Sequence, residues 1–173
     1  MSSQLKPAVN ERDHLQGSAS APIEIVEYGD FQCPHCGAAY PVIKKMQEVF
    51  GNQIKFIFRN FPLSESHQYA KIAALAAEAA GLQGKYWEMH DAIYENQDQL
   101  NDDLLYKLAQ TLGLDEQQFE KDIQSPELNE KVEADFESGM RSGVSGTPSF
   151  FVNGQKFDGG AEDLYNMLKD SAE

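Results

Sequence analysis

The sequence predicts an α/β fold in which a strand–helix–strand unit and a later strand–strand–helix unit build one mixed sheet, interrupted by an all-α helical insertion. Three observations lead to this prediction. Short runs of β-branched and aromatic residues, typical of strands, occur near both ends of the chain. The stretch between them shows helical spacing, and the only two cysteines lie where the first helix should begin. The length of 173 residues suits one domain, or one domain with a sizeable insertion.

The first unit combines a buried strand, an amphipathic helix and a second strand. Residues 23–28 carry apolar side chains on both faces, as in the interior of a sheet. The helix is predicted to begin after Cys33, with Pro34 at its first position, and to stop at Gly51. Residues 54–58 form the second strand and complete a βαβ unit. The apolar positions of the helix are Ala39, Val42, Ile43, Met46, Val49 and Phe50.

Residues 64–142 show apolar side chains at helical spacing, so we expect helices throughout this stretch. Asp115 with Gln118 resembles a capping box at the start of one helix. Ser125-Pro126 predicts the start of the next helix. That helix carries Leu128, Val132, Phe136 and Met140 at a spacing of four.

The strand pattern returns after the helical stretch. Residues 149–152 predict a strand, Asn153-Gly154 a type I′ hairpin turn, and residues 155–158 the partner strand. A closing helix carries Ala161, Leu164, Met167 and Leu168. We therefore expect an N-terminal arm at 1–21, a discontinuous α/β domain at 22–63 and 143–173, and a helical insertion domain at 64–142.

Composition narrows the function classes. The chain has 14 basic and 28 acidic residues, a formal charge of −14, which argues against nucleic-acid or anionic-membrane partners. No stretch approaches the roughly 18 apolar residues of a membrane span. Residues 1–16 lack the apolar core of a secretory signal. We therefore expect a cytoplasmic protein, or a periplasmic or other extracytoplasmic one if a signal was removed.

The two cysteines form the motif Cys33-Pro34-His35-Cys36. Residues three apart on a helix are neighbours, so a disulfide can close between them without backbone movement. Because the loop that it closes is tiny, the bond restricts the unfolded chain very little. The spacing therefore favours a redox switch over a structural staple. A Cys-x-x-Cys motif beside a βαβ pattern is typical of a dithiol–disulfide redox site.

The first cysteine is the expected nucleophile. The N-terminus of a helix favours an anion, so Cys33 should be a thiolate at neutral pH and attack first. His35 can add a positive charge or a hydrogen-bond donor to the same sulfur. Cys36 lies one turn further and is expected to be less exposed and to act as the resolving thiol.

The alternative for the cysteine pair is half of a zinc site. Such a site needs two further ligands at close spacing. His14 lies in the predicted arm, His67 is expected to begin a helix, and His90 lies at helical spacing from aromatic residues, where core packing is expected. We therefore expect no metal and no other cofactor.

Several motifs together resemble the DsbA-like thiol–disulfide oxidoreductases, whose thioredoxin fold is interrupted by a helical domain. The resemblance covers nearly everything from Pro22 to Leu168. It is carried by residues 27–36 around the cysteines, by residues 59–63 (Arg-Asn-Phe-Pro-Leu), and by residues 143–154 with their Gly-Thr-Pro sequence. The chain is most similar to short bacterial members, which also occur fused to sodium/proton antiporters.

The resemblance implies roles for residues beside the cysteines. In the family, the bond equivalent to Thr147-Pro148 is cis and faces the cysteines, and the residue before the proline pairs with an extended substrate; an ordinary trans proline is the alternative. Pro34 is expected at the same substrate surface. Phe31 belongs either to an apolar rim that receives unfolded substrate or to the core.

Glu27 occupies the position of the family's buried acid. A buried carboxyl has a raised pKa and can relay the proton that Cys36 must lose. A solvated glutamate at a strand end is the alternative. Asp30 follows Gly29 in the turn and is expected to be a capping or solvated residue.

These features predict a DsbA-like enzyme that exchanges disulfides with protein or peptide thiols through a mixed disulfide at Cys33. Its direction, as oxidase, reductase or isomerase, stays open. So does its redox partner, which is glutathione, a thioredoxin system or a membrane oxidase. Two other classes stay open, a non-catalytic DsbA-like adaptor and a glutathione-conjugating relative of the fold. A binding module needs neither the cysteine pair nor His35, and conjugating relatives normally use a serine.

Overall fold

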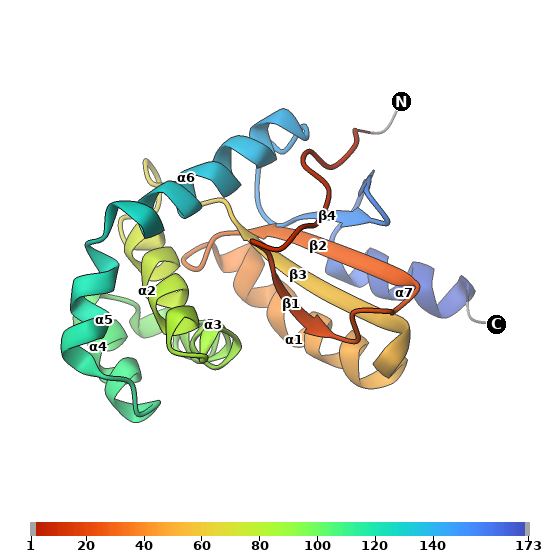
Figure 1. Ribbon diagram of the computed structural model, residues 1–173. Coiled ribbons are helices and arrows are strands. Elements are labelled where there is room, and N and C mark those ends of the chain that lie inside the picture. The colour runs from red at the N-terminus through yellow and green to blue at the C-terminus, as the bar shows by residue number, and fades with distance from the viewer. Residues whose placement is uncertain (1–2, 172–173) are drawn as a thin grey trace.

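A five-stranded mixed sheet forms the centre of the computed structural model, which describes residues 3–171 (Figure 1). Its strands are β1 (His14–Gly17), β2 (Ile23–Gly29), β3 (Ile54–Asn60), β4 (Ser149–Val152) and β5 (Gln155–Phe157). Their spatial order is β1-β3-β2-β4-β5. β2 runs parallel to β3, and the other neighbouring pairs are antiparallel. The sheet confirms the predicted α/β class and the central place of the first predicted strand.

The helices form two groups. Helices α1 (Pro34–Phe50) and α7 (Ala161–Ser171) pack against each other beside the sheet. The other group lies beyond one end of the sheet, at the left of Figure 1, and confirms the all-α insertion of the predicted fold. It contains α2 (Ala70–Leu82), α3 (Tyr86–Glu95), α4 (Asp102–Thr111), α5 (Glu116–Ile123) and α6 (Pro126–Arg141), with short 3₁₀ turns η1 (Gly51–Gln53) after α1 and η2 (Gln97–Gln99) after α3. The insertion boundaries at 64 and 142 stay a prediction.

Both faces of β2 are buried, as its sequence predicts. Ile25 packs into a large cluster that includes apolar residues of α1, α3 and α7. Val26 and Tyr28 point into a second cluster with Phe151. Because side chains alternate along a strand, Glu27 lies on the same face as Ile25, toward α1.

Most of the helix and turn boundaries that local sequence signals predicted are confirmed. Gly51 ends α1 with φ of 53°, and Ser125 accepts a hydrogen bond from the Leu128 N–H. The Asn153-Gly154 turn has positive φ at both residues, as a type I′ turn requires. The capping box is one-sided, however. Asp115 accepts from the Gln118 N–H, but the Gln118 side chain bonds to Asp122 instead of returning to the cap.

Two apolar positions assigned to helix faces are exposed. Val49 in α1 is 49% exposed and Met140 in α6 is 56% exposed. Both lie in the last turn of their helix. Helical spacing identifies a face, but it does not say how far along the helix the neighbouring element reaches.

The predicted arm at 1–21 is not a separate appendage, because its residues 14–17 form the edge strand β1. The strand pairs antiparallel with β3, and His14 lies opposite Phe58. Gly17 has φ of +98°, and a Cβ there would lie only 2.7 Å from the carbonyl oxygen of Ile54. The strand is too short and too polar to give a β pattern, since Leu15 is its one apolar residue. Residues 14–17 are extended because they pair with the edge of β3 that would otherwise be open.

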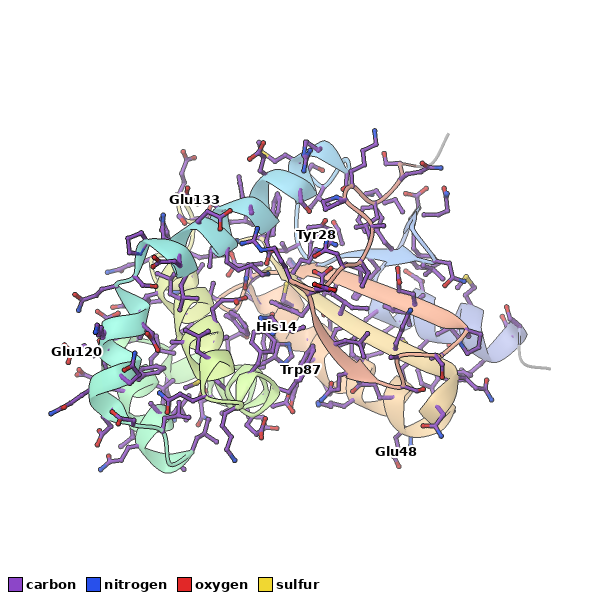
Figure 2. All side chains as sticks on the ribbon, viewed as in Figure 1. His14, Tyr28, Glu48, Trp87, Glu120 and Glu133 are labelled. Carbon is purple, nitrogen blue, oxygen red and sulfur yellow. The ribbon has the colours of Figure 1, made fainter. Side chains whose placement is uncertain are left out.

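A buried polar network joins this edge strand to the helical group. His14 contacts Glu78 of α2 at 2.9 Å, and Glu78 accepts at 3.0 Å from the Asn60 side chain of β3. Asn60 also donates to Asp135 of α6, which is paired with Lys131 at 2.8 Å. Figure 2 shows His14 where the sheet meets the helices. The network fixes the helical group against the strand ends.

The same arm contributes a buried ion pair. Arg59 of β3 donates from Nε and Nη2 to the two carboxylate oxygens of Asp13, both at 2.8 Å. Their side chains are 2% and 4% exposed. Arg59 also donates to the Tyr28 hydroxyl at 2.9 Å and to backbone carbonyls of the arm. This pair ties the arm to the centre of the sheet.

Candidate active site

Cys33 and Cys36 lie at the N-terminal end of α1, just beyond the end of β2. Cys33 is the N-cap residue, with φ of −70° and ψ of 123°, and Pro34 lies in the first turn as predicted. Both cysteines are free thiols. Cys33 is 4% and Cys36 is 1% exposed, so Cys36 is the more buried sulfur, as expected.

Hydrogen bonds lower the pKa of Cys33 to about 5. The largest contribution comes from the Cys36 thiol, and smaller ones come from the Thr147 side chain and from the first-turn backbone N–H groups of Cys36 and His35, whereas burial acts in the opposite direction. For Cys36, burial raises the pKa far above the usual range, and the Cys33 hydrogen bond and the charge of Glu27 add to this rise. Near neutral pH the pair is therefore a thiolate at Cys33 and a thiol at Cys36.

The side chain of His35 is exposed on the first turn of α1. Its backbone N–H, and not its ring, is among the main contributors to the lowered pKa of Cys33. The helix start therefore provides the predicted electrostatic help through its amides. The ring lines the groove described below.

The Thr147–Pro148 bond is cis, as expected, and lies beside Cys33. The Cys33 thiol donates to the Thr147 carbonyl oxygen at 3.7 Å. The Thr147 hydroxyl is buried and has no hydrogen-bond partner within residues 3–171. It can therefore donate to the Cys33 sulfur when that sulfur is a thiolate, and this is the side-chain contribution of Thr147 to the lowered pKa of Cys33.

Replacing Thr147 by Val is expected to raise the pKa of Cys33 by about one unit, because the variant keeps the shape but loses a donor to a charged acceptor. The measurement is a pH titration of the ultraviolet absorbance of the thiolate. Ser149→Ala is the control, since the Ser149 hydroxyl donates within the same loop, to the Gly146 carbonyl at 2.7 Å. An unchanged pKa in Thr147→Val would show that the hydroxyl does not serve the thiolate.

Glu27 is buried, at 4% exposure, and not solvated. Burial, and secondarily the charge of Cys33, raises its pKa to about 8. Glu27 and Cys36 line the same small cavity, whose volume is about 10 Å³. A Cβ on Gly29 would lie 2.9 Å from Glu27 Oε2. The Phe58 ring would be closer still, at 2.4 Å, so the glycine leaves space for both the ring and the carboxyl.

The loop between β2 and α1 is held by the side chain of Asp30. Asp30, expected to be capping or solvated, is 1% exposed. It accepts from the N–H groups of Gln32 and Leu63 and contacts His67 Nδ1 at 2.7 Å. Correspondingly, His67 lies in the loop before α2 and does not begin a helix. Asp30 therefore connects the loop before α1 to the segment that follows β3.

Gln97 of η2 also positions the cysteine loop. Its side-chain N–H₂ group donates to the carbonyl oxygens of Phe31 and Cys33, at 2.9 and 2.8 Å. A Cβ on Gly37 would lie 2.1 Å from Gln97 Oε1, so the close approach of this side chain requires the glycine. No sequence signal distinguishes Gln97 from the other polar residues of the helical region.

Phe31 is a core residue, and its assignment to a substrate-binding rim is wrong. It is 1% exposed, and its ring centroid lies 5.0 Å from that of Phe58 and 5.1 Å from that of Tyr94. An aromatic residue that follows a turn near the site looks the same in sequence whether it faces in or out. Here the helical group covers it.

A groove of about 460 Å³ runs beside the cysteines between α1 and the start of α7. Its lining includes the exposed His35, the Thr147–Pro148 loop and the small residues Ala38 and Gly160. No group of three or more His, Cys, Asp or Glu side chains in residues 3–171 is arranged to hold a metal ion. The same residues contain no helix long and apolar enough to cross a bilayer.

Comparisons with known proteins agree with this geometry. The family model described as thioredoxin matches residues 9–170. BdbD from Bacillus subtilis has a TM-score of 0.82 at 23% identity, over 99% of this chain and 95% of that one. A thioredoxin-like oxidoreductase from Silicibacter pomeroyi has a TM-score of 0.80 at 24% identity, over 94% of each chain. At these identities the two structures establish the fold alone.

Curated relatives have higher identity but are much longer. A protein named Na(+)/H(+) antiporter NhaA 1 from Salinispora arenicola is 42% identical over 88% of this chain and 23% of its own length. The protein of the same name from Mycolicibacterium vanbaalenii is 39% identical over 90% of this chain and 25% of its own. The chain thus spans about a quarter of these relatives. On its sequence match and its architecture, it belongs to the thioredoxin family and has the fold of the DsbA-like members.

Proposed function

We propose that the chain is a thiol–disulfide oxidoreductase that exchanges disulfides with protein or peptide thiols through Cys33 and Cys36. The observation that carries the proposal is the opposite ionisation of two sulfurs in one helical turn. The pKa of Cys33 is lowered to about 5, whereas that of Cys36 is raised. A nucleophile must be a thiolate at working pH, and a resolving thiol must wait until a mixed disulfide has formed.

The exchange follows from this division. The Cys33 thiolate attacks one sulfur of a substrate disulfide, the S–S bond breaks, and the other substrate sulfur leaves as a thiolate. Cys36 then loses its proton and attacks the Cys33 sulfur, which releases the second substrate thiolate. Two electrons pass to the substrate, and the protein keeps a Cys33–Cys36 disulfide. The reverse sequence oxidises a dithiol substrate.

Glu27 is the proposed acceptor of the Cys36 proton. Two causes raise its pKa, burial and the negative charge of Cys33. The second cause disappears when Cys33 enters the mixed disulfide, because its sulfur is then neutral. The pKa of Glu27 falls at that moment, so a larger fraction of the carboxyl is ionised when Cys36 needs a base.

The groove beside the cysteines is the proposed substrate surface. Thr147 precedes the cis proline next to Cys33, where its backbone can pair with an extended peptide. Pro34 and His35 are exposed next to it. An unfolded protein segment has the extended shape that such a surface requires.

The direction of exchange depends on the partner that resets the pair. A stabilised thiolate stabilises the dithiol form and makes the disulfide oxidising. A reducing cytoplasm would therefore keep the pair reduced and use it as a reductase, with glutathione or a thioredoxin system as partner. An oxidising compartment would use the same pair as an oxidase, with a membrane oxidase as partner.

The test uses a disulfide-bonded peptide and two variants. Cys36→Ala is expected to accumulate a covalent peptide adduct at Cys33, visible by mass spectrometry and lost on adding dithiothreitol, because the resolving thiol is missing. Cys33→Ala is expected to lose at least 10³-fold in exchange rate, since the raised pKa of Cys36 leaves it protonated. A Cys33→Ala variant that turns over normally would refute the proposal. Binding without exchange in the wild type would indicate an adaptor.

A further inference from the structure

A buried histidine of the helical group lines the same cavity as the resolving cysteine. His90 of α3 is 4% exposed. It shares with Glu27 and Cys36 the cavity of about 10 Å³, which is about the smallest volume that can hold one water. The mechanism above does not use this residue.

The hydrogen bonding of His90 makes one ring nitrogen available. Nδ1 lies 2.9 Å from Asp91 Oδ1, and Nε2 is buried without a partner in the described part of the chain. When the Asp91 carboxylate accepts from Nδ1–H, the neutral ring has its lone pair on Nε2. A buried polar atom without a hydrogen-bond partner is uncommon, and it indicates either a bound water or a functional role for that atom.

The surroundings of the ring connect the cavity to the surface. Aromatic rings enclose the His90 imidazole, whose centroid lies 4.8, 5.0 and 5.2 Å from those of Phe58, Trp87 and Tyr94. Asp91 is 25% exposed and forms an ion pair with the 34% exposed Lys44 at 2.8 Å. A route therefore runs from the cavity through the imidazole to a carboxylate at solvent.

We propose that His90 is the second proton carrier, after Glu27, in a path that takes the Cys36 proton to solvent. This inference rests on the proposed exchange function. Cys36 gives its proton to Glu27, and Glu27 passes it through a cavity water to His90 Nε2. The imidazolium is stabilised by Asp91 and returns a proton to solvent on the Asp91 side. Glu27 and His90 thereby return to the states that they have in the mixed disulfide, with Glu27 ionised and His90 neutral.

The charges around His90 fit a transient proton carrier. Burial lowers its pKa, whereas the Asp91 hydrogen bond raises it, so the ring is neutral at rest but gains a counter-charge when protonated. The titratable or charged groups that line the cavity or act on the ring come from several elements. They are Glu27 of β2, Cys36, Tyr40 and Lys44 of α1, Asp91 and Tyr94 of α3, and His14 of β1.

The test separates the two sulfur steps with a chromogenic disulfide, 5,5′-dithiobis(2-nitrobenzoate), in stopped flow. The fast, reagent-dependent phase is attack by Cys33, and the slower, reagent-independent phase is attack by Cys36 on the mixed disulfide. His90→Asn keeps a donor near Asp91 but cannot carry a proton. It is expected to slow the second phase about tenfold at pH 7 and to leave the first phase unchanged. The difference should shrink toward pH 9, where hydroxide serves as the base.

Two further variants decide between a proton path and altered packing. Trp87→Phe alters the packing against the His90 ring, whose centroid lies 5.0 Å from that of Trp87, but Trp87 carries no titratable group and does not line the cavity. This variant should leave the second phase unchanged. Asp91→Asn keeps the His90 ring but removes its counter-charge, and it should slow only the second phase. This second test holds even if His90→Asn does not fold.

The outcomes are distinguishable. An unchanged second phase in His90→Asn, or in Asp91→Asn, overturns the path, as does equal slowing in Trp87→Phe. Slowing that persists undiminished at pH 9 also overturns it, because a base effect must fade there. If the wild type shows no Cys33-dependent first phase, it is the exchange function that fails.

Discussion

Replacing Glu27 by Gln is expected to slow attack by Cys36 about 10²-fold at pH 7, while attack by Cys33 keeps its rate. The amide has the size of the carboxyl but cannot accept a proton inside the cavity that Glu27 and Cys36 share. The two phases of the chromogenic disulfide reaction report the two attacks separately. Glu24→Gln is the matched control, since Glu24 lies in the same strand but pairs with Lys55 at 3.6 Å. Equal second-phase rates in wild type and Glu27→Gln would exclude Glu27 as the base.

The same substitution is expected to remove a pH-dependent loss of stability. The pKa of Glu27 is about 8 in the fold, against an ordinary value of 4.5, so the unfolded chain releases this proton first as pH rises. The penalty is absent below about pH 4.5 and grows by up to about 1.4 kcal/mol per pH unit until about pH 8. Urea unfolding of the dithiol protein should therefore show Glu27→Gln gaining about 3 kcal/mol on wild type between pH 4 and 7. A constant difference would contradict the raised pKa.

Replacing Asp13 by Ala is expected to lower the free energy of unfolding by about 3–5 kcal/mol. The reason is that Arg59 would remain buried, at 2% exposure, without the carboxylate that accepts two of its hydrogen bonds. Burial opposes ionisation of Asp13, but the Arg59 hydrogen bonds outweigh it and lower the pKa. The contribution of Asp13 is therefore present above its unfolded pKa and is lost as pH falls through the lower folded value.

The adjacent residue provides the control for this prediction. Arg12 forms an equally short ion pair with Glu130, at 2.7 Å, but the two side chains are 55% and 62% exposed. Arg12→Ala should therefore cost less than about 1 kcal/mol. Chemical denaturation of both variants at pH 7 gives the comparison. Similar losses in the two variants would mean that burial does not set the value of these pairs.

Strong local signals account for the parts of the fold that the sequence predicted. Pro34 marks the start of α1 and Gly51 its end, and the Asn153-Gly154 turn fixes the hairpin. These residues have few conformational options, so the local structure that they predict depends little on tertiary context. The cysteine motif is local in the same sense, because helix geometry alone brings its sulfurs together.

The missed features depend on contacts between distant segments. Gln97 reaches the carbonyl of Cys33 across 64 positions of sequence, and Asp13 meets Arg59 across 46. Charged residues such as Asp135 and Lys131 are normally solvated, so the sequence offered no reason to bury them. Phe31 was ambiguous for a related reason, since only the position of the helical group decides whether its ring is covered.

The edge strand β1 also bears on aggregation. β3 carries four large apolar side chains in its first five residues, Ile54, Phe56, Ile57 and Phe58, and β1 pairs with the backbone of residues 55–58 along one side. A strand of this composition with an open edge is a template for pairing with other chains. Residues 14–17 therefore protect the protein from intermolecular β-pairing. Shortening the chain to the start of β2 would expose that template, even though every proposed catalytic residue would remain.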